Sequence, residues 1–175
     1  MKKKFYLLTL GHQDKNKNVL NFLKIYNKKF PNNFLFTIAG KIEKQQYIEL
    51  KLLIKNNKNI QIINRYLNNN EYKKLLNKAD LIVIPDGYIY KYMHSGVIWD
   101  CFALEKPFLA PDNAINRDYI KSYKVGLIYN KNFKTIILKK FLKSNYKKYF
   151  KILKKDYSFN ENIKKAKNFL NENLK

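Results

Sequence analysis

Short apolar runs alternate with longer amphipathic stretches along most of the chain. The apolar runs predict strands at 5–10, 34–39, 59–63, 80–85, 107–110 and 125–129. The amphipathic stretches between them predict helices at 18–29, 43–54, 71–77, 96–104 and 116–122. This alternation indicates repeated βα units. We therefore expect an α/β fold with a doubly wound parallel sheet of about six strands and helices on both faces.

The C-terminal part has a different pattern. From Asn132 the chain is lysine-rich and has a helical pattern, with an interruption near Asp156 and Tyr157. It resumes at Ser158, where Ser158 and Glu161 have the spacing of a capping box. No linker or internal repeat is visible. We expect one domain over 1–175, with 132–175 as a helical arm that could be detachable. The arm either packs on its own sheet or lies against a missing domain or an anionic membrane surface.

The first residues and the cysteine content bear on the cellular compartment. A lysine-rich start precedes an apolar run that ends at Gly11, which is too short for a signal peptide. Later runs are too short to cross a bilayer. Cys101 is the only cysteine of the 175 residues and suits a reducing compartment. These features predict a cytoplasmic protein.

The formal net charge of +23 suggests an anionic partner. Arg65 and Arg117 are the only arginines, however, and lysine supplies the rest of the positive charge. Phosphate and nucleic-acid recognition favour the bidentate guanidinium of arginine. We expect mainly a solvated lysine surface and no specific nucleic-acid partner. The alternatives for the charge are an anionic membrane surface or a phosphorylated substrate.

The loop after the first predicted strand is the first candidate site. Ligands of open parallel sheets bind outside the carboxyl ends of the strands. Gly11 would let a ligand approach the backbone, beside His12, and Lys17 precedes the next helix. The alternative for Lys17 is one more solvated lysine. Asp86, after the run at 80–85, either faces a ligand or turns the chain.

The second candidate site begins the helix predicted after the run at 80–85. Ser95 and Gly96 would expose backbone N–H groups to a diphosphate, next to His94 and Val97. Asp100, one turn later, could accept hydrogen bonds from ribose hydroxyls. The alternative is an ordinary capped helix that packs Trp99 and Phe102 into the core.

Other chemistry has little support in the sequence. His12 and His94, with one distant cysteine, do not form a metal site. Neither a Walker loop nor a GxGxxG fingerprint is present. We expect Cys101 to fill the core and no metal ion or cofactor to bind.

In their order and spacing, these segments resemble the C-terminal, donor-binding half of GT-B fold glycosyltransferases. The similarity is to the large retaining family that uses nucleotide sugars (glycosyl transferases group 1, family four), with its Rossmann-like domain. It covers roughly 5–129. It rests on the segments Leu8–Gly11, Lys17–Asn18, Phe34–Gly40, Ala79–Pro85 and His94–Phe108.

The resemblance implies a hexosyltransferase-type enzyme that holds a nucleotide-diphosphate sugar without a metal ion. The implied donor-binding residues are Gly11, His12, Lys17, Asp86, His94, Ser95, Gly96, Val97 and Asp100. The catalytic residues stay unassigned. Three positions depart from the family: Asp100 and Tyr92 stand where glutamates are usual, and His12 replaces a frequent arginine.

A complete GT-B enzyme also has an N-terminal acceptor domain. We expect that domain, or a separate subunit, as the partner of this chain, in surface polysaccharide or glycolipid synthesis. The protein would work in the cytoplasm, with the inner face of the membrane as an alternative location. The rival functions are a basic Rossmann-like nucleic-acid-binding module and a noncatalytic partner of a membrane-bound subunit.

Overall fold

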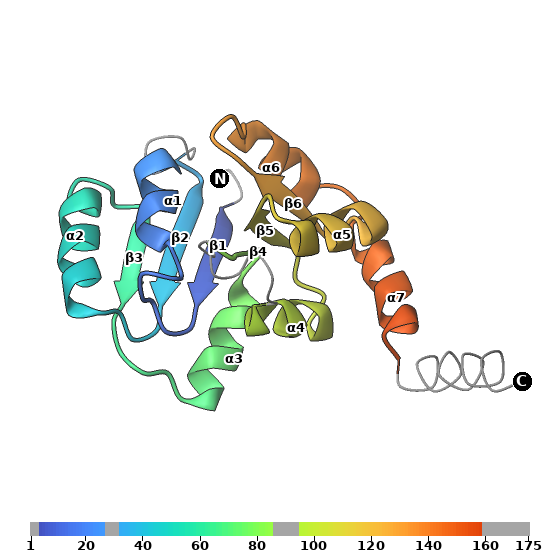
Figure 1. The fold of residues 1–175 in the computed structure, drawn as a ribbon, viewed down its shortest axis with the longest axis horizontal. Helices are drawn as coiled ribbons and strands as arrows, with labels where there is room; N and C mark the ends of the chain where they lie inside the picture. The colour runs from blue at the N-terminus through green and yellow to red at the C-terminus, as the bar shows by residue number, and fades with distance from the viewer. Residues whose placement is uncertain (1–3, 27–31, 86–94, 159–175) are drawn as a thin grey trace, which may run out of the picture.

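The computed structural model describes residues 4–26, 32–85 and 95–158. Its sheet is parallel, with the strand order β3-β2-β1-β4-β5-β6. The strands are β1 (Phe5–Leu10), β2 (Phe34–Ala39), β3 (Ile60–Ile63), β4 (Leu81–Val83), β5 (Phe108–Pro111) and β6 (Gly126–Tyr129). The strand order reverses between β1 and β4, as in a doubly wound sheet. The predicted fold class is therefore confirmed (Figure 1).

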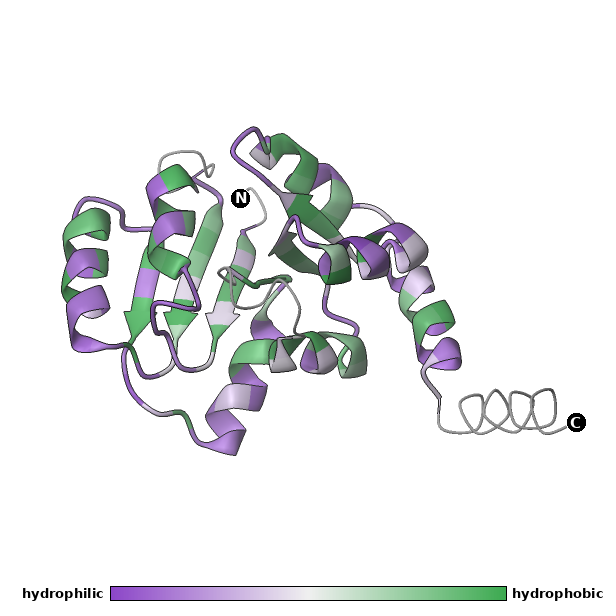
Figure 2. Ribbon diagram, viewed as in Figure 1, coloured by the Kyte–Doolittle hydropathy of each residue, from purple (hydrophilic) through white to green (hydrophobic). Residues whose placement is uncertain are grey.

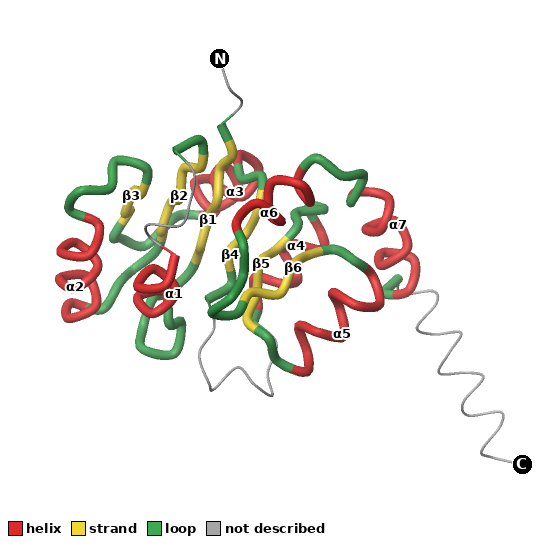
Figure 3. Tube along the Cα trace, turned by 90° about the horizontal axis from the view of Figure 1, so that it is seen from above, coloured by secondary structure: helices red, strands yellow, loops and turns green. Residues whose placement is uncertain are grey.

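Helices cover both faces of this sheet (Figures 1 and 3). One face packs against α1 (Val19–Tyr26), α2 (Lys44–Ile54) and α6 (Thr135–Leu142). The other packs against α3 (Asn69–Lys78), α4 (Gly96–Ala103), α5 (Ala114–Tyr123) and α7 (Lys147–Asp156). None of the helices in the described ranges is long and apolar enough to span a membrane.

Two hydrophobic cores lie on the two sides of the sheet, because successive side chains of a strand point in opposite directions. Leu7 of β1 is buried with Phe22 of α1 on one side. Leu8, the next residue, is buried with Phe102 of α4 on the other. Figure 2 shows the resulting pattern, with largely hydrophobic strands and hydrophilic stretches on α2 and α3.

Most predicted boundaries agree with the structure within two residues. The strand predicted at 80–85 is shortened at both ends, since β4 is confined to Leu81–Val83. Before it, the side chain of Asp80 accepts a hydrogen bond from the backbone N–H of Tyr6 at 2.9 Å. Helix α5 begins two residues early because Asn113 caps it through the N–H of Asn116 at 2.8 Å.

The arm predicted from Asn132 is helical in the part that the structure describes, and it consists of two helices, α6 and α7. The helix breaks between α6 and α7, where the Ser144 hydroxyl donates to the carbonyl of Phe141 at 2.7 Å and so competes with the helical pattern. Leu138 of α6 and Phe150 of α7 are buried in opposite cores. The two helices thus pack on the sheet itself. The predicted Ser158–Glu161 capping box is not tested, because Glu161 lies outside the described residues.

Candidate functional site

The loop after β1 is attached to the loop after β2. Gly11 has a φ of +98°, in the left-handed region, and Gly40 has a φ of +135°. A Cβ on Gly40 would lie 2.0 Å from the Gly11 carbonyl oxygen, whereas a Cβ on Gly11 would meet nothing within 4 Å. Only a glycine therefore fits at position 40. The space over Gly11 is open, as close approach of a ligand would require.

The rest of this loop is shaped by its own polar groups. The N–H of Gln13 donates to the carbonyl of Lys41 at 2.8 Å and continues the pairing of β1 with β2. The Asp14 carboxylate accepts hydrogen bonds from the backbone N–H groups of Asn16 at 2.9 Å and Lys17 at 3.1 Å. This turn fixes the backbone of Lys17 just before α1 begins.

Helix α4 begins at the predicted residues. Ser95 is its N-cap and is 1% exposed. The Ser95 side chain makes no capping hydrogen bond, although its carbonyl accepts the N–H of Ile98 at 2.9 Å. Gly96 and Val97 open the first turn, which contains no acidic residue. A Cβ on Gly96 would meet nothing within 4 Å, so the space in front of this helix end is open.

A single contact joins the two predicted segments. The Lys17 ammonium donates to the Ser95 hydroxyl at 3.3 Å, across 78 positions of sequence. This places a cation at the positive end of the α4 dipole. An anion between them would be attracted by both.

Asp100 lies on α4, one turn after Gly96, and is partly exposed. Its Oδ2 accepts a hydrogen bond from the Tyr72 hydroxyl at 2.6 Å. Burial, together with this hydrogen bond and the negative charge of Asp100, raises the pKa of Tyr72 well above its ordinary value, so Tyr72 stays a donor. The sequence prediction missed Tyr72. The sequence shows that Tyr72 directly follows the Asn68–Glu71 capping box and so lies at the start of a helix. Its contact with α4, however, depends on the strand order.

A cluster of possible metal ligands also lies where the loop after β1 meets the start of α2. His12, Asp14 and Glu43 each offer one ligand atom, and these atoms lie within 4.8 Å of one another. His12 and Glu43 are exposed, and the Asp14 carboxylate already holds the turn. Exposed acidic groups often meet in this way without an ion. The expectation of metal-free binding therefore stays a prediction.

The remaining candidates divide into two groups. Asp86 and His94 lie outside the described residues, as does Tyr92. Cys101 is fully buried, and burial raises the pKa of its thiol, so it fills the core as predicted. The alternative interpretation of α4, in which Trp99 and Phe102 both pack into the core, is half correct. Phe102 is buried, but Trp99 is 46% exposed.

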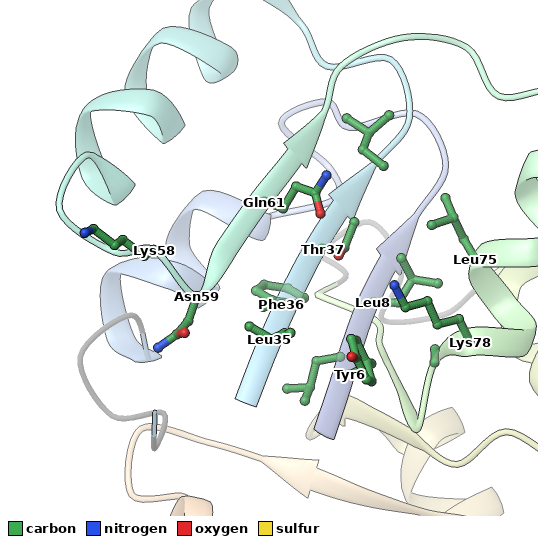
Figure 4. Close-up of a pocket in the computed structure, with 13 residues that line it drawn as sticks. Tyr6, Leu8, Leu35, Phe36, Thr37, Lys58, Asn59, Gln61, Leu75 and Lys78 are labelled. Atoms are coloured by element: carbon green, nitrogen blue, oxygen red, sulfur yellow. The ribbon is translucent and has the colours of Figure 1, made fainter. Parts of the chain in front are cut away.

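A pocket of about 300 Å³ lies on the sheet face, away from these residues (Figure 4). Side chains of three strands line it, among them Tyr6, Thr37 and Gln61, with Lys58 and Lys78 at its rim. Helix α3 lies along one side of this pocket and contributes Leu75 and Lys78 to its lining (Figure 4).

Solved structures share this fold. The C-terminal domain of a glycosyl transferase group 1 family protein (LpcC) from Francisella tularensis has a TM-score of 0.66 and 15% identity; the match covers 90% of this chain and 88% of that one. TarM has a TM-score of 0.67 and 16% identity, with 97% of this chain and 36% of TarM covered. A putative UDP-N-acetylglucosamine 2-epimerase from Listeria monocytogenes has a TM-score of 0.54 and 12% identity, with coverage of 85% and 40%.

These likenesses establish the fold but not the reaction, because a glycosyltransferase domain and an epimerase both appear among them. The chain also spans well under half the length of TarM and of the epimerase. No curated protein matches its sequence significantly.

The sequence gives the finer assignment. The family model described as "Glycosyl transferases group 1" matches residues 1–166, nearly the whole chain. That span includes the loop after β1, the start of α4, and helices α6 and α7. The chain therefore belongs to the glycosyl transferases group 1 family, and its domain is a glycosyltransferase domain.

Proposed function

We propose that this chain is the donor-binding domain of a hexosyltransferase-type enzyme that uses a nucleotide-diphosphate sugar. The diphosphate would bind between the loop after β1 and the first turn of α4. Its ligands would be the backbone N–H groups of Gly96 and Val97 together with the Lys17 ammonium. Gly11, His12, Asp86, His94 and Ser95 complete the proposed donor-binding set.

The observation that carries this proposal is the contact between Lys17 and Ser95. A cation next to the N-terminus of a helix is unfavourable, because the dipole and the charge have the same sign there. The side chain of Ser95 does not cap the helix, and the first turn of α4 contains no acidic residue. The Lys17 ammonium and the N-terminal end of α4 would both attract a bound diphosphate. The same groups would stabilise the diphosphate as it leaves the sugar, in the role that a metal ion has elsewhere.

Asp100 is proposed as the ribose ligand. The Tyr72 hydroxyl donates a hydrogen bond to Oδ2 of Asp100. The second oxygen of the carboxylate can then accept a hydrogen bond from a ribose hydroxyl. The hydrogen bond from Tyr72 also restrains the carboxylate, so less side-chain entropy is lost on binding.

The wider function is proposed from the family. The chain would act with an N-terminal acceptor domain or a separate subunit, in the synthesis of a surface polysaccharide or glycolipid. It would work in the cytoplasm or on the inner face of the membrane. Neither a metal ion nor a sequence-specific nucleic acid would be required.

The experiment is a thermal-shift series with UDP, GDP, ADP, CMP and inorganic diphosphate, each with and without EDTA. A ligand that binds only the native state raises its melting temperature. We expect one nucleoside diphosphate to do so, and EDTA to change nothing. Loss of the shift in EDTA would instead assign a metal ion, with His12, Asp14 and Glu43 as its first candidates.

A pair of lysine variants tests the role of the contact between Lys17 and Ser95. Lys17→Met should abolish the shift, because it removes the cation beside α4. Lys15→Met is the matched control, since Lys15 is exposed two positions away in the same loop. Equal effects of the two variants, or no shift with any nucleotide, would contradict the proposed site.

A further inference from the structure

A second surface lies where α4 and α7 meet. Trp99 of α4 is 46% exposed, and its ring centroid lies 5.9 Å from that of Tyr157, which is 42% exposed. Trp99 also contacts Phe102 at 5.6 Å. These rings and Leu153 line a shallow hollow of about 410 Å³. Large aromatic rings are thus gathered at the surface, close to the end of α7.

Helix α7, beside these rings, carries a high positive charge, and its Lys154 lines the hollow. Its lysines are all exposed: Lys147, Lys148, Lys151, Lys154 and Lys155. Its one acidic residue, Asp156, is hydrogen-bonded to Tyr123 of α5. Lys154 pairs with Glu105 at 3.0 Å, the only ion pair of α7 among the described residues. Ile152, on the same helix, is 54% exposed.

We propose that this α4–α7 surface, made of Trp99, Ile152, Tyr157 and the α7 lysines, docks onto an anionic lipid membrane. An interfacial helix typically combines a lysine-rich face with exposed aromatic and aliphatic side chains. Lysines close to an anionic leaflet are attracted to it, and each contributes to the affinity. Tryptophan and tyrosine are favoured at the headgroup level, because their rings are apolar and their edges are polar.

Charge complementarity selects this occupant over two others. A nucleic acid of the same charge would be recognised better by arginine, which α7 lacks. A second copy of the chain, with a net charge of +23, would be repelled by the lysines of α7.

The inference is independent of the proposed nucleotide site, which uses other side chains of α4. Membrane docking would nevertheless bring Gly96 and the donor close to the lipid surface, since Trp99 lies one turn away on the same helix. A lipid-linked acceptor would then reach the donor with little loss of translational freedom.

The sole tryptophan makes a direct test possible. The full chain is mixed with vesicles of phosphatidylcholine alone, or of phosphatidylcholine with phosphatidylglycerol, and Trp99 emission is recorded. We expect a blue shift with the anionic vesicles only, and quenching by brominated lipids in the same vesicles. Binding without quenching of Trp99 would place the contact on another face and overturn the inference.

Two matched charge reversals complete the test. Lys151→Glu with Lys155→Glu reverses an exposed i, i+4 pair on α7 and should lower vesicle partitioning by at least about tenfold. Lys51→Glu with Lys55→Glu makes the same change at α2, on the opposite side of the molecule (Figure 1), and should have a much smaller effect.

Three results would overturn the inference. Equal loss of vesicle binding in the two double variants would indicate attraction to the whole lysine surface. A blue shift with single-stranded RNA but not with vesicles would assign a nucleic-acid partner. A concentration-dependent blue shift without any lipid would assign self-association.

Discussion

The two segments of the candidate site are built in different ways. The backbone of the loop after β1 is fixed by the neighbouring loop and by its own Asp14 turn: Gly40 packs on Gly11, and Gln13 pairs with the backbone of Lys41. The first turn of α4 has no side-chain cap, and open space lies in front of Gly96. Contacts within the protein therefore fix the first segment, whereas the start of the second is open to the proposed ligand.

A substitution at Gly40, which packs on the loop after β1, should have the largest effect, and it should act on stability. Gly40→Ala puts a Cβ at 2.0 Å from the Gly11 carbonyl, at a φ where alanine is strained. We expect a loss of about 3 kcal/mol or more in the free energy of unfolding, since overpacking and backbone strain add. Urea denaturation measures it. A wild-type midpoint would show that the two loops are not in close contact.

Asp100→Asn should have the next largest effect, measured here on nucleotide binding. Loss of a charge-assisted hydrogen bond costs about 1.5–3 kcal/mol, or roughly ten- to a hundredfold in nucleotide affinity. Asp118→Asn is the control, because Asp118 is exposed on α5 and the charge change is identical. Titration calorimetry with the nucleotide selected by the thermal-shift series measures both. Unchanged affinity for Asp100→Asn would remove it from the site.

Gly96→Ala sharpens the contrast with Gly40→Ala. The added methyl group meets no protein atom within 4 Å, so stability should change by less than about 0.5 kcal/mol. The same methyl group would obstruct a diphosphate on the first turn, and affinity should fall by about tenfold, or 1.4 kcal/mol. Denaturation and calorimetry on the same sample separate the two effects. A destabilised variant with normal affinity would reverse the roles given to the two segments.

The smallest effect should appear at alkaline pH, on the α4 side of the sheet. The pKa of Tyr123 is raised to about 12, first by burial and then by its hydrogen bond to Asp156. In the unfolded chain the hydroxyl of a tyrosine ionises near pH 10. The stability that Tyr123 contributes is therefore complete below pH 10 and is lost as the pH rises towards 12.

Thermal melting between pH 8 and pH 11.5 follows this loss, with Tyr123→Phe as the comparison. The variant should be somewhat less sensitive to alkali than the wild type, whereas Tyr66→Phe, an exposed tyrosine, should behave like the wild type. A steeper alkaline loss in Tyr123→Phe would contradict the assignment.

The sequence predicted the fold well because local pattern and fold agree. The limits of β1 and β2 were exact, and Ser95 and Gly96 were correctly placed at the start of a helix. The break around Ser144 was missed because it depends on a side-chain hydrogen bond that a lysine-rich helical pattern conceals.

The site was less accessible to sequence reasoning. Lys17 was a candidate from its place after the first glycine loop, but its contact with Ser95 follows from β1 lying next to β4. Tyr72 and Glu43 were missed for the same reason: they are brought in by strand order and not by neighbouring sequence. Their local signals, a capped helix and an ordinary loop, carry no chemistry of their own.

The buried thiol of Cys101 has a practical consequence for kinetics. It is the only cysteine, lies on α4 and is fully inaccessible in the native state. A thiol reagent can therefore modify it only when α4 transiently opens, and the modification rate follows the population of that open form. Any ligand that binds the start of α4 must slow this rate. The rate of Cys101 modification thus measures how often α4 opens, without an added label.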